Sequence, residues 1–547
     1  MSKIKLFALG GLNENGKNMY VIDIDNEIFI FDAGYKLADD HMLGIDYIIP
    51  NYDYIKENKD NVKGIFISHG HDSQYGALPD ILEELPNIPV YGTDFTLEII
   101  KNVLEEQNIK KYNFKTIIPY KNIRFKNASI FPVNLTHSVP GSVGYVINTK
   151  DGAIVYTSNF LFDPTMQGPY KTDIGKLAYV GKQGVLCLMS ESMYADHKGY
   201  TSPNNRIESI IKEELNKNDN RILFNIFEAQ LYRIQELFNA VTLTDRKVVV
   251  LGKKLENMIN KAIDLKYIDF DKSKLCGLNH INDPKIVVLI SDDREKPFSN
   301  IGRIIRGNDK FIKVSSDDTI IFASPAYDGL EKSATRMYDE IAKKDINLVI
   351  IPKKYLSHHA SSEDLMMMIN LMNPKYYFPV IGEYRHQVAN ADVANKVGIA
   401  PENILLKLNG DVVEFQDGNL VETTEHIKVD DILVDGKTAG DVGELVLKDR
   451  ELLSDNGIVI VSATIDKETK KVLAGPEILT RGFIYVKDNI DLIKESERLS
   501  LEIINENIKP NYVDFNKIKL GIRDKLGKYL YQQTECKPMI LVVIQEV

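Results

Sequence analysis

The chain has 547 residues, and 67 Lys and Arg against 78 Asp and Glu give it a formal net charge of −11. Its 44% hydrophobic and 27% charged residues are ordinary for a globular protein of two to four domains. No run of about 18 apolar residues is present, which argues against a membrane span.

The acidic balance gives no general attraction for nucleic acid, so binding of a polyanion would need a local basic cleft. The three cysteines, Cys187, Cys276 and Cys536, are scattered along the chain. That usage favours core packing in a reducing cytoplasm over disulfides or a cysteine metal site. We therefore expect a cytoplasmic protein.

Short strands with a Gly-rich corner over residues 4–33 predict an antiparallel meander. Asp32 ends the last of these strands, just before Ala33 and Gly34. A carboxylate there could orient a side chain at the sheet edge, although a turn or capping role fits the sequence equally well.

A strand predicted over 64–67 runs out into a loop that carries His69 and His71, with a helix predicted over 77–85. Two histidines one residue apart on a turn that contains glycine can aim both rings at one metal ion. The loop therefore predicts a metal site, but one with few ligands.

Polar side chains also follow several of the next strands. His137 lies before Ser138 and Pro140 near a strand end, Asn159 follows a strand from residue 153, and Glu191 follows a strand from residue 185. A lone strand histidine is more often a core or surface residue, but a strand end projects its side chain into a cleft. The pattern predicts an αββα sandwich with a site along one sheet edge.

From about residue 201, helices and strands alternate, which predicts a parallel α/β domain. Its predicted helices are 206–216, 228–241 and 255–264, and its predicted strands 221–224, 248–252, 286–290 and 319–323. A strand over 348–351 leads to the segment 357–361 and a helix over 362–372. Short strands with Asp-Gly turns follow over 411–449. A last α/β unit has strands 457–463 and 539–544 and helices 488–506 and 514–530.

Several ordered motifs now identify a family that the whole chain resembles. They are Gly10-Gly11 with Gly16-Lys17-Asn18-Met19, Phe31-Asp32-Ala33-Gly34, Leu43-Gly44-Ile45-Asp46, His69-Gly70-His71, Thr136-His137-Ser138, Ser357-His358-His359-Ala360-Ser361, Gly382-Glu383-Tyr384-Arg385, and Ala474-Gly475-Pro476 with Thr480-Arg481-Gly482-Phe483. The sequence resembles ribonuclease J, a bacterial metallo-β-lactamase-fold nuclease. The resemblance implies an α/β fold class: a metallo-β-lactamase αββα sandwich in two parts, with an inserted β-CASP α/β domain and a small C-terminal α/β domain. The expected bounds are 1–200 and 346–430 for the sandwich, 201–345 for the β-CASP domain, 431–449 for a linker and 450–547 for the C-terminal domain.

Active members of this family hydrolyse RNA with two metal ions. The resemblance implies a first metal at His69, His71 and His137. At the positions that hold or bridge the second metal, this chain has four residues without a charge: Ser73, Gln74, Asn159 and Ile381. Two cations close together need anionic ligands to offset their repulsion. We therefore expect a residual single site for Zn²⁺ or Mn²⁺, or no metal. Asp72, one position early, is expected to point away from it.

The phosphate-binding half of the resemblance is better preserved. It implies that His359 contacts the scissile phosphate and that Ser357 and Ser361 cradle it, beside the free N–H groups of a helix that starts near residue 361. His358 replaces the family's glycine and adds bulk there. Glu191 fits either an orienting or a catalytic role.

His197 and His386 match no ligand position in the family, so we expect both at the surface.

Three functional hypotheses follow. In the first, the chain resembles the second, degenerate paralogue of bacteria with two copies, and assists an active ribonuclease J in mRNA decay and rRNA processing. Its partners would be RNA and that paralogue, and it would form a homo- or hetero-oligomer (dimer or tetramer). No membrane partner is expected. In the second, it is an active 5′-to-3′ exoribonuclease, with some endonuclease action, at a residual single-metal site. In the third, it is an RNA-binding scaffold.

Overall fold

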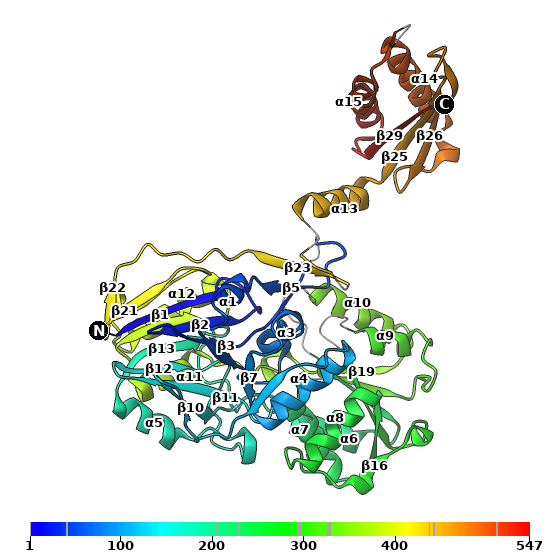
Figure 1. Cartoon of the computed structure of the whole chain (residues 1–547). Helices are drawn as coiled ribbons and strands as arrows, with labels where there is room; N and C mark the ends of the chain where they lie inside the picture. The colour runs from blue at the N-terminus through cyan, green and yellow to red at the C-terminus, as the bar shows by residue number, and fades with distance from the viewer. Residues whose placement is uncertain are drawn as a thin grey trace. The chain divides into compact units, whose positions relative to one another are not determined.

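The computed structural model describes residues 2–39, 42–203, 205–227, 230–292, 298–324, 330–436, 438–440, 443–509 and 512–547 (Figure 1). It has two compact units, which are described separately. The larger comprises residues 1–37 and 46–433, and the smaller residues 38–45 and 434–547. None of the helices within these described ranges is long and apolar enough to cross a membrane.

Two sheets face each other at the centre of the larger unit. The first has eight strands in the order β22-β21-β1-β2-β3-β6-β7-β8, and the second has six in the order β20-β13-β12-β11-β10-β9. The strands of the first sheet are β1 (Lys3–Gly10), β2 (Met19–Ile24), β3 (Glu27–Phe31), β6 (Val62–Phe66), β7 (Pro89–Gly92), β8 (Asn113–Thr116), β21 (Val413–Gln416) and β22 (Asn419–Val421). Those of the second are β9 (Ile123–Arg124), β10 (Ser129–Asn134), β11 (Val143–Thr149), β12 (Gly152–Tyr156), β13 (Val185–Glu191) and β20 (Tyr376–Val380).

Aromatic side chains from both sheets fill the space between them. Phe31 and Phe66 of the first sheet meet Tyr145 of the second, with ring centroids 5.4 and 5.7 Å apart. Helices α5 (Ile174–Gln183), α11 (Ser362–Met372) and α12 (Tyr384–Lys396) bury their apolar sides on the outer face of the second sheet. Helix α4 (Asp94–Glu106) packs on β7 and β8 of the first. The predicted αββα sandwich is confirmed.

The inserted α/β domain is built on a six-stranded sheet in the order β16-β15-β17-β14-β18-β19, whose neighbouring strands are all parallel. Its strands are β14 (Ile222–Phe227), β15 (Lys247–Leu251), β16 (Leu275–Cys276), β17 (Ile286–Asp292), β18 (Thr319–Phe322) and β19 (Asn347–Ile350). Its helices are α6 (Glu208–Lys217), α7 (Leu231–Thr242), α8 (Lys253–Asp264), α9 (Ser299–Ile305) and α10 (Glu331–Ala342). The apolar strands are covered on both faces, as a parallel sheet requires. The sheet extends past residue 345 because β19 is its last strand, and the first two residues of the helix expected over 228–241 lie outside the described residues.

The smaller unit contains a three-stranded sheet in the order β26-β25-β29, from β25 (Ile458–Ile465), β26 (Val472–Arg481) and β29 (Met539–Glu546). Helices α14 (Ile490–Glu506) and α15 (Phe515–Thr534) share one apolar core with this sheet. Helix α13 (Glu444–Asn456) crosses the boundary expected at residues 449 and 450, and parts of the expected linker, residues 437 and 441–442, lie outside the described residues.

Candidate metal and phosphate site

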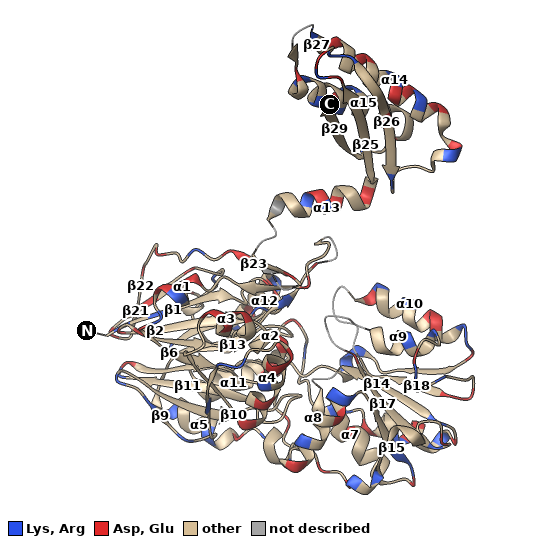
Figure 2. Cartoon of the chain, turned by 45° about the vertical axis from the view of Figure 1, so that its right-hand side comes forward, with Lys and Arg blue, Asp and Glu red and all other residues tan. Residues whose placement is uncertain are grey.

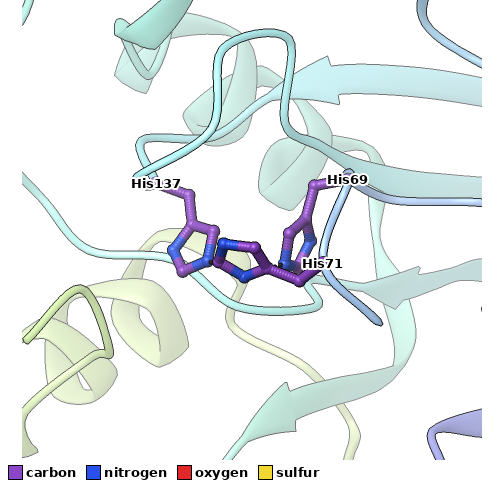
Figure 3. A group of neighbouring side chains, drawn as sticks. All are labelled: His69, His71 and His137. Carbon is purple, nitrogen blue, oxygen red and sulfur yellow. Dashed lines mark hydrogen bonds between the residues drawn. The ribbon is translucent and has the colours of Figure 1, made fainter. Parts of the chain in front are cut away.

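Three histidine rings meet at one edge of the sandwich. His69 and His71 come from the loop after β6, and His137 from the loop after β10. Figure 3 shows their rings turned toward one another. Nδ1 of His71 lies 3.2 Å from Nε2 of His69 and 3.3 Å from Nε2 of His137. Among the described residues, these histidines are the group whose ligand atoms could hold a metal ion, and no carboxylate belongs to it.

The outer nitrogen of each ring is held by a hydrogen-bond partner. Nδ1 of His69 lies 3.0 Å from Oγ of Ser68, Nδ1 of His137 lies 3.0 Å from the carbonyl oxygen of His358, and Nε2 of His71 lies 3.3 Å from Oγ of Ser138. A metal-binding histidine commonly donates its second N–H in this way, which fixes the tautomer and turns the other nitrogen's lone pair inward. The set is therefore arranged as three inward-facing ligands.

Ser68 is held in turn by Asp32. The Asp32 carboxylate accepts hydrogen bonds from the backbone N–H of Ser68 at 2.8 Å and from its hydroxyl at 3.0 Å. Tyr156 also donates to this carboxylate, at 2.6 Å. Of the two roles left open for Asp32, the contacts support orientation of a side chain: Asp32 holds Ser68, and Ser68 in turn holds the His69 ring.

The electrostatics of His69 and His137 favour neutral imidazole. Burial, together with the neighbouring histidines, holds the pKa of His69 and of His137 well below its usual value. Neutral imidazole is the form that binds a metal.

Two of the three nitrogen separations match one tetrahedral zinc ion. With Zn–N bonds of 2.0–2.1 Å, the nitrogens of a tetrahedral site lie about 3.3 Å apart; Nδ1 of His71 is 3.2 and 3.3 Å from the other two, and all three nitrogens lie within 4.8 Å of one another. These residues could hold one zinc, which when bound would act as a Lewis acid.

The positions expected to hold a second metal carry uncharged side chains that bond to one another. Oγ of Ser73 donates to Oε1 of Gln74 at 2.5 Å, and Nε2 of Gln74 lies 3.4 Å from Oδ1 of Asn159. Nδ2 of Asn159 lies 3.1 Å from Nδ1 of His359. Amide and hydroxyl groups bond to one another here where a cation would need carboxylates.

Ile381 is the fourth of these positions and adopts a left-handed backbone, with φ of 55°. A β-branched residue in that region is strained, because its branched Cβ crowds the following carbonyl. The conformation is retained by neighbours: its N–H donates to the Tyr20 hydroxyl at 3.1 Å, and its carbonyl accepts from the N–H of Ser192 at 2.9 Å. The backbone at this position is strained, yet the side chain offers no ligand.

Glu191 is fully buried and binds three groups. Its Oε1 accepts hydrogen bonds from the N–H groups of Phe160 and Ala360, at 2.7 and 3.1 Å. Its Oε2 lies 2.8 Å from Nδ1 of His359. The carboxylate therefore takes up the Nδ1–H of His359 and leaves Nε2 as the ring's free nitrogen.

Ser357 and Ser361 both form hydrogen bonds beside His359. The Ser357 hydroxyl accepts from the N–H of His359 at 3.3 Å. Oγ of Ser361 lies 2.7 Å from Oγ1 of Thr201, which donates to the His359 carbonyl at 2.5 Å. Thr201 was missed in the sequence analysis because no spacing connects it to a segment 160 residues away.

The N–H groups at the start of α11 were expected to be free, and this expectation is wrong. Ser361 is the N-cap and forms a capping box with Asp364. The N–H groups of Ser362 and Glu363 donate to the carbonyls of His197 and Gly199. Protein acceptors take up the first turn of the helix, so it has no N–H left for a phosphate.

Three other histidines lie around this site. The His358 ring is buried, its centroid 6.0 Å from that of Tyr232, and burial beside Arg233 lowers its pKa well below the usual value. His386 is only 5% exposed, so its expected surface position is wrong; the helical pattern of α12 places it on the buried side. His197 is exposed, as expected.

His71, His137, Asn159 and His359 line a cavity of about 960 Å³ in the larger unit, between the sandwich and the inserted domain. Lys198, Lys353 and Lys354 lie on its wall, as do His71, Asp72 and His359. Figure 2 shows acidic residues along α4, and Glu106 of this helix lines the cavity. Cationic and anionic side chains are mixed on the wall: Glu106 lies 3.8 Å from Lys254, and Asp196 is two residues from Lys198.

Family models match four segments of the chain. They are described as the metallo-beta-lactamase superfamily (residues 12–167), the ribonuclease J beta-CASP domain (219–341), a Zn-dependent metallo-hydrolase RNA specificity domain (344–402) and the ribonuclease J C-terminal domain (445–547). Proteins called Ribonuclease J 2 from Staphylococcus aureus and Staphylococcus epidermidis are 37% and 36% identical to the chain over its full length and 98% of theirs. A solved structure of a protein of unknown function from Enterococcus faecalis, 16% identical with a TM-score of 0.54, covers 76% of this chain and 100% of its own.

The fold and the histidine site define a metallo-β-lactamase-fold protein with an inserted β-CASP domain. Full-length identity and the matched domains place the chain more narrowly: it belongs to the ribonuclease J family.

Proposed function

We propose that this chain is an RNA-binding subunit of ribonuclease J assemblies with little or no hydrolytic activity of its own. One observation carries the proposal: Gln74 and Asn159, which stand where the family has second-metal ligands, are hydrogen-bonded to each other, with Nε2 of Gln74 3.4 Å from Oδ1 of Asn159. Two-metal hydrolysis stabilises both the attacking and the leaving oxygen, and a single cation at His69, His71 and His137 cannot occupy both places.

RNA as the ligand is supported by the matched RNA specificity domain and by the ribonuclease relatives. An RNA-processing role would place the protein in the cytoplasm. The proposed partner is an active ribonuclease J paralogue, to which this chain would add RNA-binding surface in mRNA decay and rRNA processing. Homo-oligomers are the alternative assembly.

Activity is tested with the purified chain, Mn²⁺ or Mg²⁺, and a 5′-monophosphorylated RNA. We expect no processive release of mononucleotides. A variant that combines Ser73→Asp, Gln74→His, Asn159→Asp and Ile381→His should gain metal-dependent release, and His69→Ala added to it should abolish that gain. Processive release by the unmodified chain would contradict the proposal.

The partner is tested by purifying the tagged full chain from its own cells. Stoichiometric recovery of a ribonuclease J paralogue would support the assembly, whereas recovery of this chain alone would count against it.

A single-metal ribonuclease is the second candidate, because two of the three separations between the histidine nitrogens suit one zinc ion. His359, oriented by Glu191, would contact the phosphate in that reaction. RNA hydrolysis by the unmodified chain that disappears in His69→Ala would favour this candidate.

A further inference from the structure

A stack of three aromatic rings leads from His359 toward the surface. The Tyr194 ring lies 5.7 Å from that of His359, centroid to centroid, with 23° between the planes. The His197 ring follows at 4.2 Å and 20°. All three residues line the cavity.

The outer end of this stack is accessible. The His197 side chain is 56% exposed, and within the described residues Tyr194 is the aromatic ring that stacks on it. Nδ1 of His197 lies 2.8 Å from Oδ1 of Asp196, which fixes the plane of the ring. The carbonyl of His197 also accepts the N–H of Ser362, so its backbone is held to the start of α11.

The stack has the properties of a nucleobase platform. Proteins that bind single-stranded RNA combine aromatic faces, on which bases stack, with cations that follow the phosphates. Lys198 is the next residue after His197, and Lys354 lies on the same cavity wall. A base on the outer face of His197 would belong to a nucleotide near the phosphate expected at His359.

We propose that His197, backed by Tyr194, is a stacking site for one base of a single-stranded RNA held in the cavity. This inference rests on the proposed RNA binding. It adds a position that is independent of metal ions, and stacking tolerates any base because every base has a π-face. The platform would therefore hold RNA without selecting its sequence.

The probe is a fluorescently labelled, 5′-monophosphorylated single-stranded RNA of about ten nucleotides, titrated with the full chain without divalent cations. We expect His197→Ala to weaken binding about tenfold, and His197→Phe to retain most of the affinity because it keeps a ring. Loss of stacking leaves the phosphate contacts in place, so the salt dependence should not change.

His280→Ala is a matched control. His280 forms the same kind of exposed pair, with Nδ1 2.7 Å from Oδ2 of Asp283, but it does not line the cavity. Its substitution should leave RNA affinity unchanged.

A second set of RNAs carries one abasic nucleotide at each position in turn. One position should weaken binding to the unmodified chain but not further weaken binding to His197→Ala. The stacking site would be overturned if His197→Ala binds RNA as tightly as the unmodified chain. It would also be overturned if, at every position, the abasic nucleotide weakens binding to His197→Ala as much as it weakens binding to the unmodified chain. Either result leaves the proposed function standing. If the unmodified chain binds no RNA, both fail.

Discussion

At the scale of single residues, Asp32 links the sheet edge to the histidine site and titrates unusually. Burial raises the pKa of its carboxyl to about 7, against about 3.9 in an unfolded chain. Between these values the folded protein binds one proton more than the unfolded chain. The contribution of Asp32 to the free energy of unfolding is therefore complete below about pH 4 and is lost as the pH rises toward about 7.

Asp32→Asn removes this titration with little change of shape. As the pH rises from about 4 to about 7.5, the unmodified chain loses the contribution of Asp32 and the variant does not. Relative to the unmodified chain, the free energy of unfolding of the variant should therefore increase by about 2–4 kcal/mol over this range. Chemical denaturation at several pH values measures it, and other titrating groups cancel in the difference. Parallel pH profiles of the two proteins would show that the carboxyl is not perturbed.

His137→Ala tests the metal site at the same scale. His137 supplies one of the three inward nitrogens, so its loss leaves two ligands, too few for tight zinc binding. Elemental analysis should find about one zinc per chain in the unmodified protein and almost none in the variant. Zinc should also raise the melting temperature of the unmodified protein only. Equal zinc content in both would place the metal elsewhere, and His280→Ala again serves as the control.

How far the sequence predicted the site depends on how local its parts are. His69 and His71 lie two residues apart, so the sequence alone predicts a metal-binding loop. In the structure the His137 ring lies beside both. The bonds between Gln74 and Asn159, and the role of Thr201, join segments far apart in sequence. Only the fold brings those atoms together, so no spacing in the sequence could reveal them.

At the scale of elements, one carboxylate holds the start of α11 to the rest of the sandwich. Buried Asp364 accepts the backbone N–H groups of Phe162, Thr201 and Ser361, at 2.9, 2.9 and 3.1 Å. Asp364→Ala would leave these donors without their acceptor, at about 1–3 kcal/mol each. We expect a loss of at least about 3 kcal/mol in the free energy of unfolding.

Asp364→Asn is the matched variant, because it keeps the side-chain volume and, with its amide oxygen in the place of Oδ2, still accepts the N–H groups of Thr201 and Ser361. It should cost clearly less than Asp364→Ala in equilibrium denaturation. If the two variants cost the same, the hydrogen bonds accepted by Oδ2 contribute little to the stability of α11.

Elements were predictable where apolar periodicity was strong, and missed where a local signal opposed it. The bounds of α11 agree with the expected 362–372. Strand β26 was missed because it contains Gly475 and Pro476, which break most strands; at the sheet edge a proline is tolerated. Helix α13 was missed because its apolar side chains, such as Leu445 and Leu453, are exposed and follow no buried face.

At the scale of the whole molecule, a chain of net charge −11 is proposed to bind a polyanion. The two statements are compatible only if RNA follows local cations, since charges farther apart than about 10 Å are screened at moderate salt. Lys198 and Lys354 on the cavity wall are such cations. Binding should then weaken steeply with salt, by about 0.7 in the logarithmic slope for each phosphate neutralised.

Replacing both Lys198 and Lys354 by alanine should reduce the magnitude of that slope by about 1.4, because two phosphate contacts are lost. Titrations of single-stranded RNA at several salt concentrations measure it. The control replaces Lys272 and Lys285, which pair with Asp264 and Asp219 and do not line the cavity. It changes the net charge equally, so its slope should stay that of the unmodified chain. If both double variants shift the slope alike, net charge governs binding and the cavity wall is not the path of the RNA.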